Sequence, residues 1–385
     1  MYNMSDINKG YWNFDVSNHE NNYTVVDLRS DTLTKPTKAM RLAMFNAEVG
    51  DDVYEEDPTV KRLEERAAML TGKEAALFVT SGTMGNLIAI LTHCDERSSE
   101  AYCGEDSHTI LHEQGGAAQL GGISLYPLPN NPDGSFDLSL LQNKLRRDRL
   151  HEPTSKLVIV ENTINGKVVP QDWIIELAEL TKSHNLKLHL DGARIWNAAV
   201  ASNTSVEELA SVFDSVTFCL SKGLGAPIGS LLCGDADFIR KARRIRKVLG
   251  GGMRQVGIIA AAGFVSLEEI VPLLKEDHKK AALIARAIND LNSKTFSVDE
   301  KTVQTNIVFV NIHSKYITSE NFVERLVQVQ DDAEDDQIII KCLPLTSTTV
   351  RFVLYHEITE TMLEAAIRKI RYVINRMEDA NKPSA

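Results

Sequence analysis

The sequence predicts an α/β protein in which a large domain with a mixed, mostly parallel sheet precedes a smaller α+β domain. Short apolar runs, typical of buried strands, alternate with segments of helical periodicity up to about residue 275. Two of these runs lead into charged residues, Asp191 and Lys222. Beyond residue 275, a long helix, two strands and a C-terminal helix indicate the smaller domain.

The composition limits the possible function classes. The 385 residues are enough for about two ordinary domains, and 43% apolar with 25% charged residues is typical of globular proteins. The net charge of −11 comes without a basic stripe, which argues against nucleic acid as a partner. The five cysteines form no CxxC pair, and no apolar run approaches the ~20 residues that span a membrane. We therefore expect a cytoplasmic protein with reduced thiols and no membrane partner.

The N-terminal residues 1–25 are polar, rich in asparagine and without periodicity. They lack the apolar segment of a secretory signal and the basic character of a transit peptide. We expect a flexible extension at 1–25, a large domain at 26–275 and a small domain at 276–385.

The first chemically informative stretch is residues 75–91. A predicted strand at 76–79 leads into Thr80-Ser81-Gly82-Thr83 and then into an apolar helix. Hydroxyls and bare amides at a helix N-terminus form an anion site that suits a phosphate group. A simple helix cap explains Ser81 and Thr83 as well, so this turn is not specific alone.

A predicted strand at 186–191 shows alternating leucines and ends at Asp191. The distance along the chain to Lys222 suits a strand–helix–strand unit, which would bring both side chains to one edge of a sheet. The competing interpretation of Asp191 is a cap of the following helix.

Lys222 follows a buried apolar run at 216–220 and precedes several small residues. A lysine in such a partly dry crevice favours its neutral, nucleophilic amine, although a solvent-facing loop lysine would fit the same pattern. Pyridoxal phosphate requires a lysine that binds its aldehyde and an aspartate that keeps its ring nitrogen protonated. Lys222 and Asp191 match this requirement.

Two charged runs have simple interpretations. The basic run at 240–247 is expected to be a solvated helix face, and the acidic run at 331–336 a solvated loop. We expect no metal site.

The motifs DLRSDT, VGDDVYEEDPTV, SGTMGN, ENTINGKVVP, HLDGARIWNA, SKGLGAPIGSLL and GGGMRQ occur in this order from about residue 27 to residue 257. Together they strongly resemble those of the L-threonine aldolase family, including its low-specificity members. The resemblance implies the aspartate-aminotransferase-like fold (fold type I) and pyridoxal 5'-phosphate as the cofactor.

The resemblance also implies roles for individual residues. Lys222, His108 and Asp191 are the expected catalytic residues, with His108 stacked on the cofactor ring and Glu113 as the carboxylate that orients it. The expected cofactor-binding residues are Ser81, Gly82, Thr83, His108, Asn162, Asp191, Arg194, Lys222 and, from a neighbouring subunit, Lys247 and Arg254. The α-carboxylate of the substrate is expected to bind Ser30, Arg194 and Arg351.

The expected reaction is retro-aldol cleavage of L-threonine and L-allo-threonine to glycine and acetaldehyde by a homo-oligomer, with a dimer of dimers expected. Many relatives carry a histidine where this chain has Ile164. We expect Ile164 to leave the β-hydroxyl without a polar contact, so that both isomers react. A β-eliminating lyase or an aminotransferase of the same fold would share nearly every residue named. A degenerate binding scaffold would have lost Lys222, Asp191 or the phosphate turn.

Overall fold

The computed structural model describes residues 23–147 and 149–380. The chain divides into two compact units: a larger one of residues 34–275, and a smaller one of residues 1–33 together with 276–385.

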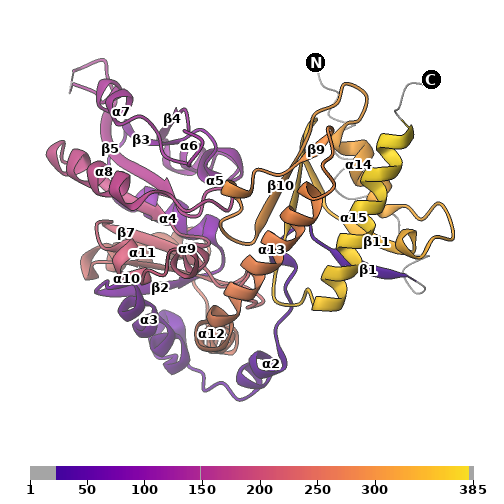
Figure 1. The fold of residues 1–385 in the computed structure, drawn as a ribbon. Helices are drawn as coiled ribbons and strands as arrows, with labels where there is room; N and C mark the ends of the chain where they lie inside the picture. Colours follow the sequence, from indigo (N-terminus) through magenta and orange to yellow (C-terminus); the bar gives the residue numbers. More distant parts are fainter. Residues whose placement is uncertain (1–22, 148, 381–385) are drawn as a thin grey trace. The chain divides into compact units, whose positions relative to one another are not determined.

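The larger unit is built on a seven-stranded sheet with the strand order β2-β8-β7-β6-β5-β3-β4 (Figure 1). Strand β8 is antiparallel to β2 and β7, and all other neighbouring strands are parallel. The predicted mixed, mostly parallel sheet is therefore confirmed. Its strands are β2 (Ala75–Val79), β3 (Ser99–Gly104), β4 (Ser124–Leu128), β5 (Thr154–Glu161), β6 (Lys187–Asp191), β7 (Ser215–Cys219) and β8 (Ser230–Gly234).

Helices cover both faces of this sheet. Leu77 and Val79 of β2 pack with α4 and α11, whereas Ala76 and Phe78 face the opposite core with α3, α8 and α12. The helices of this unit are α2 (Lys38–Phe45), α3 (Pro58–Thr71), α4 (Gly82–His93), α5 (His108–Leu111), α6 (Gly116–Gly121), α7 (Leu138–Lys144), α8 (Gln171–Ser183), α9 (Ile195–Ser202), α10 (Val206–Ala210), α11 (Ala236–Val248) and α12 (Gly257–Val265), with a short 3-10 turn at Asp52–Tyr54.

The strand directions determine where functional groups gather. Because β8 is antiparallel to both β2 and β7, the strands β2, β3, β5, β6 and β7 all run in the same direction. Their carboxyl ends therefore lie at one edge of the sheet, where ligands bind in open α/β sheets. The segments that follow these ends contain Ser81, His108, Asn162, Asp191 and Lys222.

The smaller unit has a four-stranded antiparallel sheet of order β12-β13-β10-β9 and a parallel pair of β1 and β11. Its strands are β1 (Thr24–Asp27), β9 (Phe296–Ser297), β10 (Ile307–Ile312), β11 (Ile338–Lys341), β12 (Leu343–Thr346) and β13 (Thr349–Val353). Its helices are α14 (Ser319–Val327), α15 (Glu360–Ala380) and most of α13 (Leu274–Asn289), with short 3-10 turns at Asp31–Leu33, Glu300–Thr302 and Glu334–Asp336.

Residues 26–33 were expected in the large domain, but β1 pairs in register with β11 of the smaller unit. Val26 and Leu28 lie in the apolar core of that unit beside Ile338 and Ile340. Because they share this core, residues 26–33 belong to the smaller unit. Of the predicted extension at 1–25, residues 1–22 lie outside the described part of the chain.

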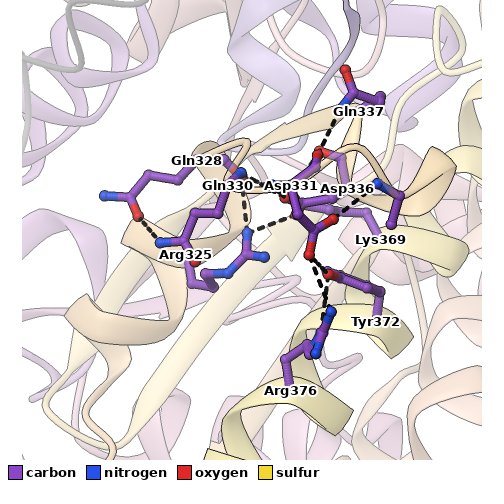
Figure 2. Close-up of polar contacts among 10 residues, drawn as sticks. Arg325, Gln328, Gln330, Asp331, Asp336, Gln337, Lys369, Tyr372 and Arg376 are labelled. Atoms are coloured by element: carbon purple, nitrogen blue, oxygen red, sulfur yellow. Dashed lines mark hydrogen bonds and ion pairs between the residues drawn. The ribbon is translucent and has the colours of Figure 1, made fainter.

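The acidic run at 331–336 is only partly solvated, because Asp336 is completely buried. Oδ1 of Asp336 lies 2.6 Å from Nζ of Lys369, also fully buried, and 2.7 Å from Nη1 of Arg325 (Figure 2). Burial alone would raise the pKa of Asp336, but hydrogen bonds from Arg325 and Lys369 lower it overall. Asp331 accepts hydrogen bonds from Tyr372 and Arg376. The prediction of a simple solvated loop is wrong for Asp336, whose cationic partners are distant in sequence.

One helical stretch, residues 257–289, is long and apolar enough to cross a membrane by length and composition alone. Half of its most apolar window is buried, and its first part, α12, packs against α2 and α3. Core helices of globular proteins pass the same test, so this stretch is weak support for a membrane span.

Candidate active site

The turn between β2 and α4 is the candidate phosphate site. Ser81 caps α4 by accepting a hydrogen bond from the backbone N–H of Met84 at 3.1 Å. A Cβ atom on Gly82 or Gly85 would lie 2.7 Å from Sγ of Cys219 or 2.6 Å from Cγ2 of Thr217. Because both positions are glycine, α4 can lie directly against β7. The amides of the first helical turn thereby lie beside the strand that leads to Lys222.

Asp191 ends β6 and is buried. Its Oδ1 accepts the backbone N–H of Ala193 at 3.1 Å, and its Oδ2 accepts Nδ2 of Asn86 at 2.7 Å. Helix α9 begins at Ile195 with Arg194, not Asp191, at its N-cap position. The interpretation of Asp191 as a helix cap is therefore wrong, which leaves the carboxylate available at the functional edge.

His108 lies just beyond β3 between two carboxylates. Its Nδ1 is 3.1 Å from Oε1 of Glu113, and its backbone N–H donates to Oε2 of Glu161 at 2.7 Å. The hydrogen bond with Glu113 raises the pKa of His108. Burial and, to a smaller extent, the negative charge of Asp191 together raise the pKa of Glu161 to about 7. This part of the site can therefore hold a proton near neutral pH.

Lys222 follows β7 and is partly exposed. Its backbone carbonyl accepts hydrogen bonds from Oγ1 of Thr34 and from the N–H of Gly225, both at 2.8 Å. Its positive charge opposes the upward shifts in the pKa values of His108 and Glu161. The backbone of Lys222 is fixed by the two hydrogen bonds to its carbonyl.

Asn162 follows the end of β5 and is buried. Its Oδ1 accepts the backbone N–H of Val169 at 3.3 Å, whereas its Nδ2 has no hydrogen-bond partner among the described residues. A buried donor without an acceptor is costly and suits an oxygen of a bound ligand. An amide donor, a carboxylate, an imidazole, a lysine and an anion-binding turn thus follow the carboxyl ends of neighbouring strands. This donor set fits pyridoxal phosphate.

Four other predicted residues also belong to the larger unit. Lys247 and Arg254 are exposed, and Arg254 pairs with Asp51 at 2.8 Å. Among the described residues, no hydrogen bond or ion pair links either of them to Asp191 or Lys222. Lys247 lines a cavity of about 560 Å³ together with Asp52, Arg243 and Arg246. Arg194 is half-buried at the start of α9, and Thr83 is exposed on α4.

Ser30 and Arg351 belong to the smaller unit. Ser30 follows β1, and Arg351 lies on β13 with Nη2 3.3 Å from the carbonyl oxygen of Arg29. The smaller unit therefore brings these two substrate-binding candidates into neighbouring positions. Their assignment to the substrate carboxylate stays a prediction.

Sequence reasoning gave no role to Asn86, His189 or Glu161. Asn86 is a buried polar residue within the apolar helix α4. A polar residue in an apolar helix was the one sequence feature that could have indicated a buried contact at this position. Asn86 donates to Asp191 and also to Oε1 of Glu113 at 2.8 Å. His108, Glu113 and Asp191 have ligand atoms within 4.8 Å of one another, an arrangement that could hold a metal ion, so the prediction of no metal stays a prediction.

Ile164 is 3% exposed and belongs to the apolar core. A Cβ on Gly134 would lie 2.2 Å from Cγ2 of Ile164, which shows how closely this side chain packs against the loop at Gly134. The expectation that Ile164 leaves the β-hydroxyl without a polar contact requires this residue to line the substrate site, and its packing in the apolar core gives that position no support.

Comparisons with known proteins identify the family. Residues 27–314 match the model of the beta-eliminating lyase family. The chain is 45% identical over 345 residues to a probable low-specificity L-threonine aldolase 2 of Arabidopsis thaliana, covering 88% of this chain and 94% of that protein. It is 48% identical to a low specificity L-threonine aldolase of Escherichia coli K12, over 75% of this chain and 85% of that protein.

Among solved structures, a putative L-allo-threonine aldolase from Listeria monocytogenes superimposes with a TM-score of 0.72 at 23% identity, covering 89% of this chain and 97% of that one. A threonine aldolase from Leishmania major gives a TM-score of 0.73 at 19% identity, covering 91% and 99%. These likenesses confirm the predicted aspartate-aminotransferase-like fold. The family match and the curated relatives together show that the chain belongs to the threonine aldolases of the beta-eliminating lyase family.

Proposed function

We propose that this protein is a lyase that cleaves the Cα–Cβ bond of L-threonine and L-allo-threonine to glycine and acetaldehyde with pyridoxal phosphate as its cofactor. The observation that carries the proposal is the set of groups at the carboxyl edge of the large sheet. The lysine, the buried carboxylate, the imidazole and the anion-binding turn occur there in a chain of the threonine aldolase family.

When bound, pyridoxal phosphate supplies an aldehyde that reacts with primary amines and a ring that accepts the electron pair of a broken bond to Cα. Lys222 would hold the aldehyde carbon through its amine. The first turn of α4, with Ser81, would bind the phosphate. Nδ2 of Asn162 would donate to the ring hydroxyl, and Asp191 would keep the ring nitrogen protonated.

The protein groups can also be assigned to the substrate. Arg194, Arg351 and Ser30 are assigned to the α-carboxylate, for which a guanidinium fork is well shaped. His108 is assigned as the base that takes the proton of the β-hydroxyl, directly or through water, while the Cα–Cβ bond breaks and acetaldehyde leaves. The hydrogen bond between His108 and Glu113 raises the pKa of His108, which helps His108 to hold the proton of the β-hydroxyl near neutral pH. A proton then returns to Cα to give glycine.

The test is a product assay on both isomers. We expect L-threonine and L-allo-threonine each to give acetaldehyde and glycine in equal amounts. The low-specificity names of the relatives support the use of both isomers, whereas the argument from Ile164 no longer does. A β-eliminating lyase would give 2-oxobutyrate and ammonia instead. Formation of those products, or strict use of one isomer, would overturn this part of the proposal.

We further propose a homo-oligomer, a dimer or a dimer of dimers, in which Lys247 and Arg254 reach the cofactor phosphate of a neighbouring subunit. Both cations are exposed in the single chain, which supports such a role. We place the protein in the cytoplasm, and its five buried, unpaired cysteines agree with a reducing compartment.

Shared sites predict complementation between two inactive variants. Chains with Lys222→Ala or with Arg254→Ala should each be nearly inactive as homo-oligomers. After dissociation and random reassembly, half of the dimers contain one chain of each kind, and each has one intact site, so about a quarter of the wild-type activity should return. Sedimentation would confirm assembly. A fully active monomer, or no recovery in assembled mixtures, would contradict the shared site.

A further inference from the structure

We infer that Asn86 is a positioning residue for this reaction, whose single side-chain amide holds Asp191 and the Glu113–His108 pair in one fixed arrangement. The inference deepens the proposed function and rests on it. Asn86 is not assigned a contact with the substrate. It contacts two carboxylates of the site, Asp191 and Glu113.

The contacts of Asn86 use both hydrogens of its amide. The side chain is 1% exposed, and Nδ2 lies 2.7 Å from Oδ2 of Asp191 and 2.8 Å from Oε1 of Glu113. Only the NH2 group of the amide can donate to two carboxylate oxygens, so the chemistry fixes which end of the amide faces them. The same Oε1 of Glu113 contacts Nδ1 of His108. One amide thereby links the candidate ring-nitrogen partner to the candidate base.

A second set of contacts fixes the other end of the amide. Oδ1 of Asn86 lies 3.2 Å from Nε2 of His189, which is completely buried. Burial lowers the pKa of His189 to about 3, so the ring is neutral. Because Oδ1 can only accept, Nε2 carries the hydrogen and Nδ1 accepts from Oγ of Ser215 at 2.8 Å. Ser215 in turn accepts from Nε2 of His93 at 2.7 Å.

The four groups therefore form a chain in which every hydrogen bond donates toward the carboxylates, from His93 through Ser215, His189 and Asn86. Donors that face a carboxylate favour its ionised form. Without Asn86, Asp191 and Glu113 would be neighbouring buried carboxylates with fewer donors between them, which is unfavourable for two negative charges. Asp191 would then be held less firmly in the position that faces a protonated ring nitrogen.

The decisive variant is Asn86→Asp, which keeps the shape of the side chain and replaces the double donor by a third carboxylate. We expect the apoenzyme to bind pyridoxal phosphate about 10- to 100-fold more weakly near pH 8.5, since hydrogen bonds to charged groups are lost. A proton on the new carboxyl restores one donor, so the affinity should recover as the pH falls toward about 6. The pH dependence of the absorbance of the bound cofactor should shift in parallel.

The matched control is Asn306→Asp in the smaller unit. Asn306 is completely buried, and its Nδ2 likewise donates to a carboxylate, Oδ2 of Asp31 at 3.1 Å, and to the carbonyl of Leu354 at 2.9 Å. The same substitution should disturb local packing there without changing the affinity for the cofactor or its spectrum. Equal effects in both variants, or wild-type affinity at all pH values in Asn86→Asp, would overturn the inference.

If Asn86→Asp does not fold, Asn86→Ser provides the test. The serine hydroxyl has one hydrogen and can donate to only one of the two carboxylates. We therefore expect this variant to bind the cofactor more weakly than the wild type. Unchanged affinity would contradict the inference. Cofactor binding is measured without an amino-acid substrate. An enzyme that binds the cofactor as expected but does not cleave threonine would therefore reject the proposed function and not the role of Asn86.

Discussion

Lys222→Ala is expected to abolish threonine cleavage and the visible absorbance of the purified protein. The wild-type protein should be yellow, because the amine of Lys222 would hold the cofactor through a conjugated bond. Turnover should fall by about 10³-fold or more, as expected when a covalent catalytic group is removed. The fold should persist, because Thr34 and Gly225 contact the backbone carbonyl of Lys222 and not its side chain.

Absorbance spectra, turnover and far-UV circular dichroism of the purified variant check this prediction. Lys187→Ala is a suitable control, since Lys187 lies at the opposite end of the strand that carries Asp191 and pairs with Asp214 at 2.7 Å. The control should stay yellow and active. A visible spectrum unchanged by Lys222→Ala would reject the assignment of the lysine.

Asp191→Asn should reduce turnover by about 10²-fold or more while changing substrate affinity much less. The neutral amide cannot stabilise the protonated ring nitrogen, so the transition state in which the ring accepts electrons loses stabilisation. The structure adds a second expectation. Both oxygens of Asp191 accept hydrogen bonds, from Asn86 and from the backbone of Ala193, so an NH2 group at either position would face another donor. That mismatch should cost about 1–3 kcal/mol of stability.

Separate measurements of kcat, KM and the thermal midpoint distinguish these two effects. A stability loss with turnover near the wild-type value would show that Asp191 only supports the local structure. A loss confined to kcat at temperatures well below unfolding is the result that we expect.

Local patterns predicted much of the larger unit. An apolar run of strand length followed by a polar residue identifies a strand end, and parallel strands bring such ends to one edge. Asp191 and Lys222 could be recognised in this way because each lies immediately beyond such a run. The close approach of α4 to β7 likewise follows from Gly82 and Gly85, although their partners Cys219 and Thr217 appear only in the fold.

Two features that sequence reasoning missed depend on partners far along the chain. Asn86 donates a hydrogen bond to Asp191, and Asp336 forms an ion pair with Lys369, and no short pattern encodes either contact. A polar residue in an apolar helix signals a buried contact but not its identity. The burial of Ile164 was missed for a related reason, because the direction of a side chain in an irregular turn has no periodicity to read.

The pairing of β1 with β11 has a consequence for how the protein is made. Strand β1 leaves the ribosome long before Ile338, the partner of Thr24 in β11, has been synthesised. Until then β1 is an unpaired strand with apolar residues, the kind of segment that chaperones bind and that aggregates when left exposed. Nascent chains that stall between residues 275 and 338 would contain all of residues 34–275 but no completed smaller unit. Expression of residues 276–385 alone would in turn leave the edge of β11 open, so the smaller unit cannot be obtained as a simple C-terminal fragment.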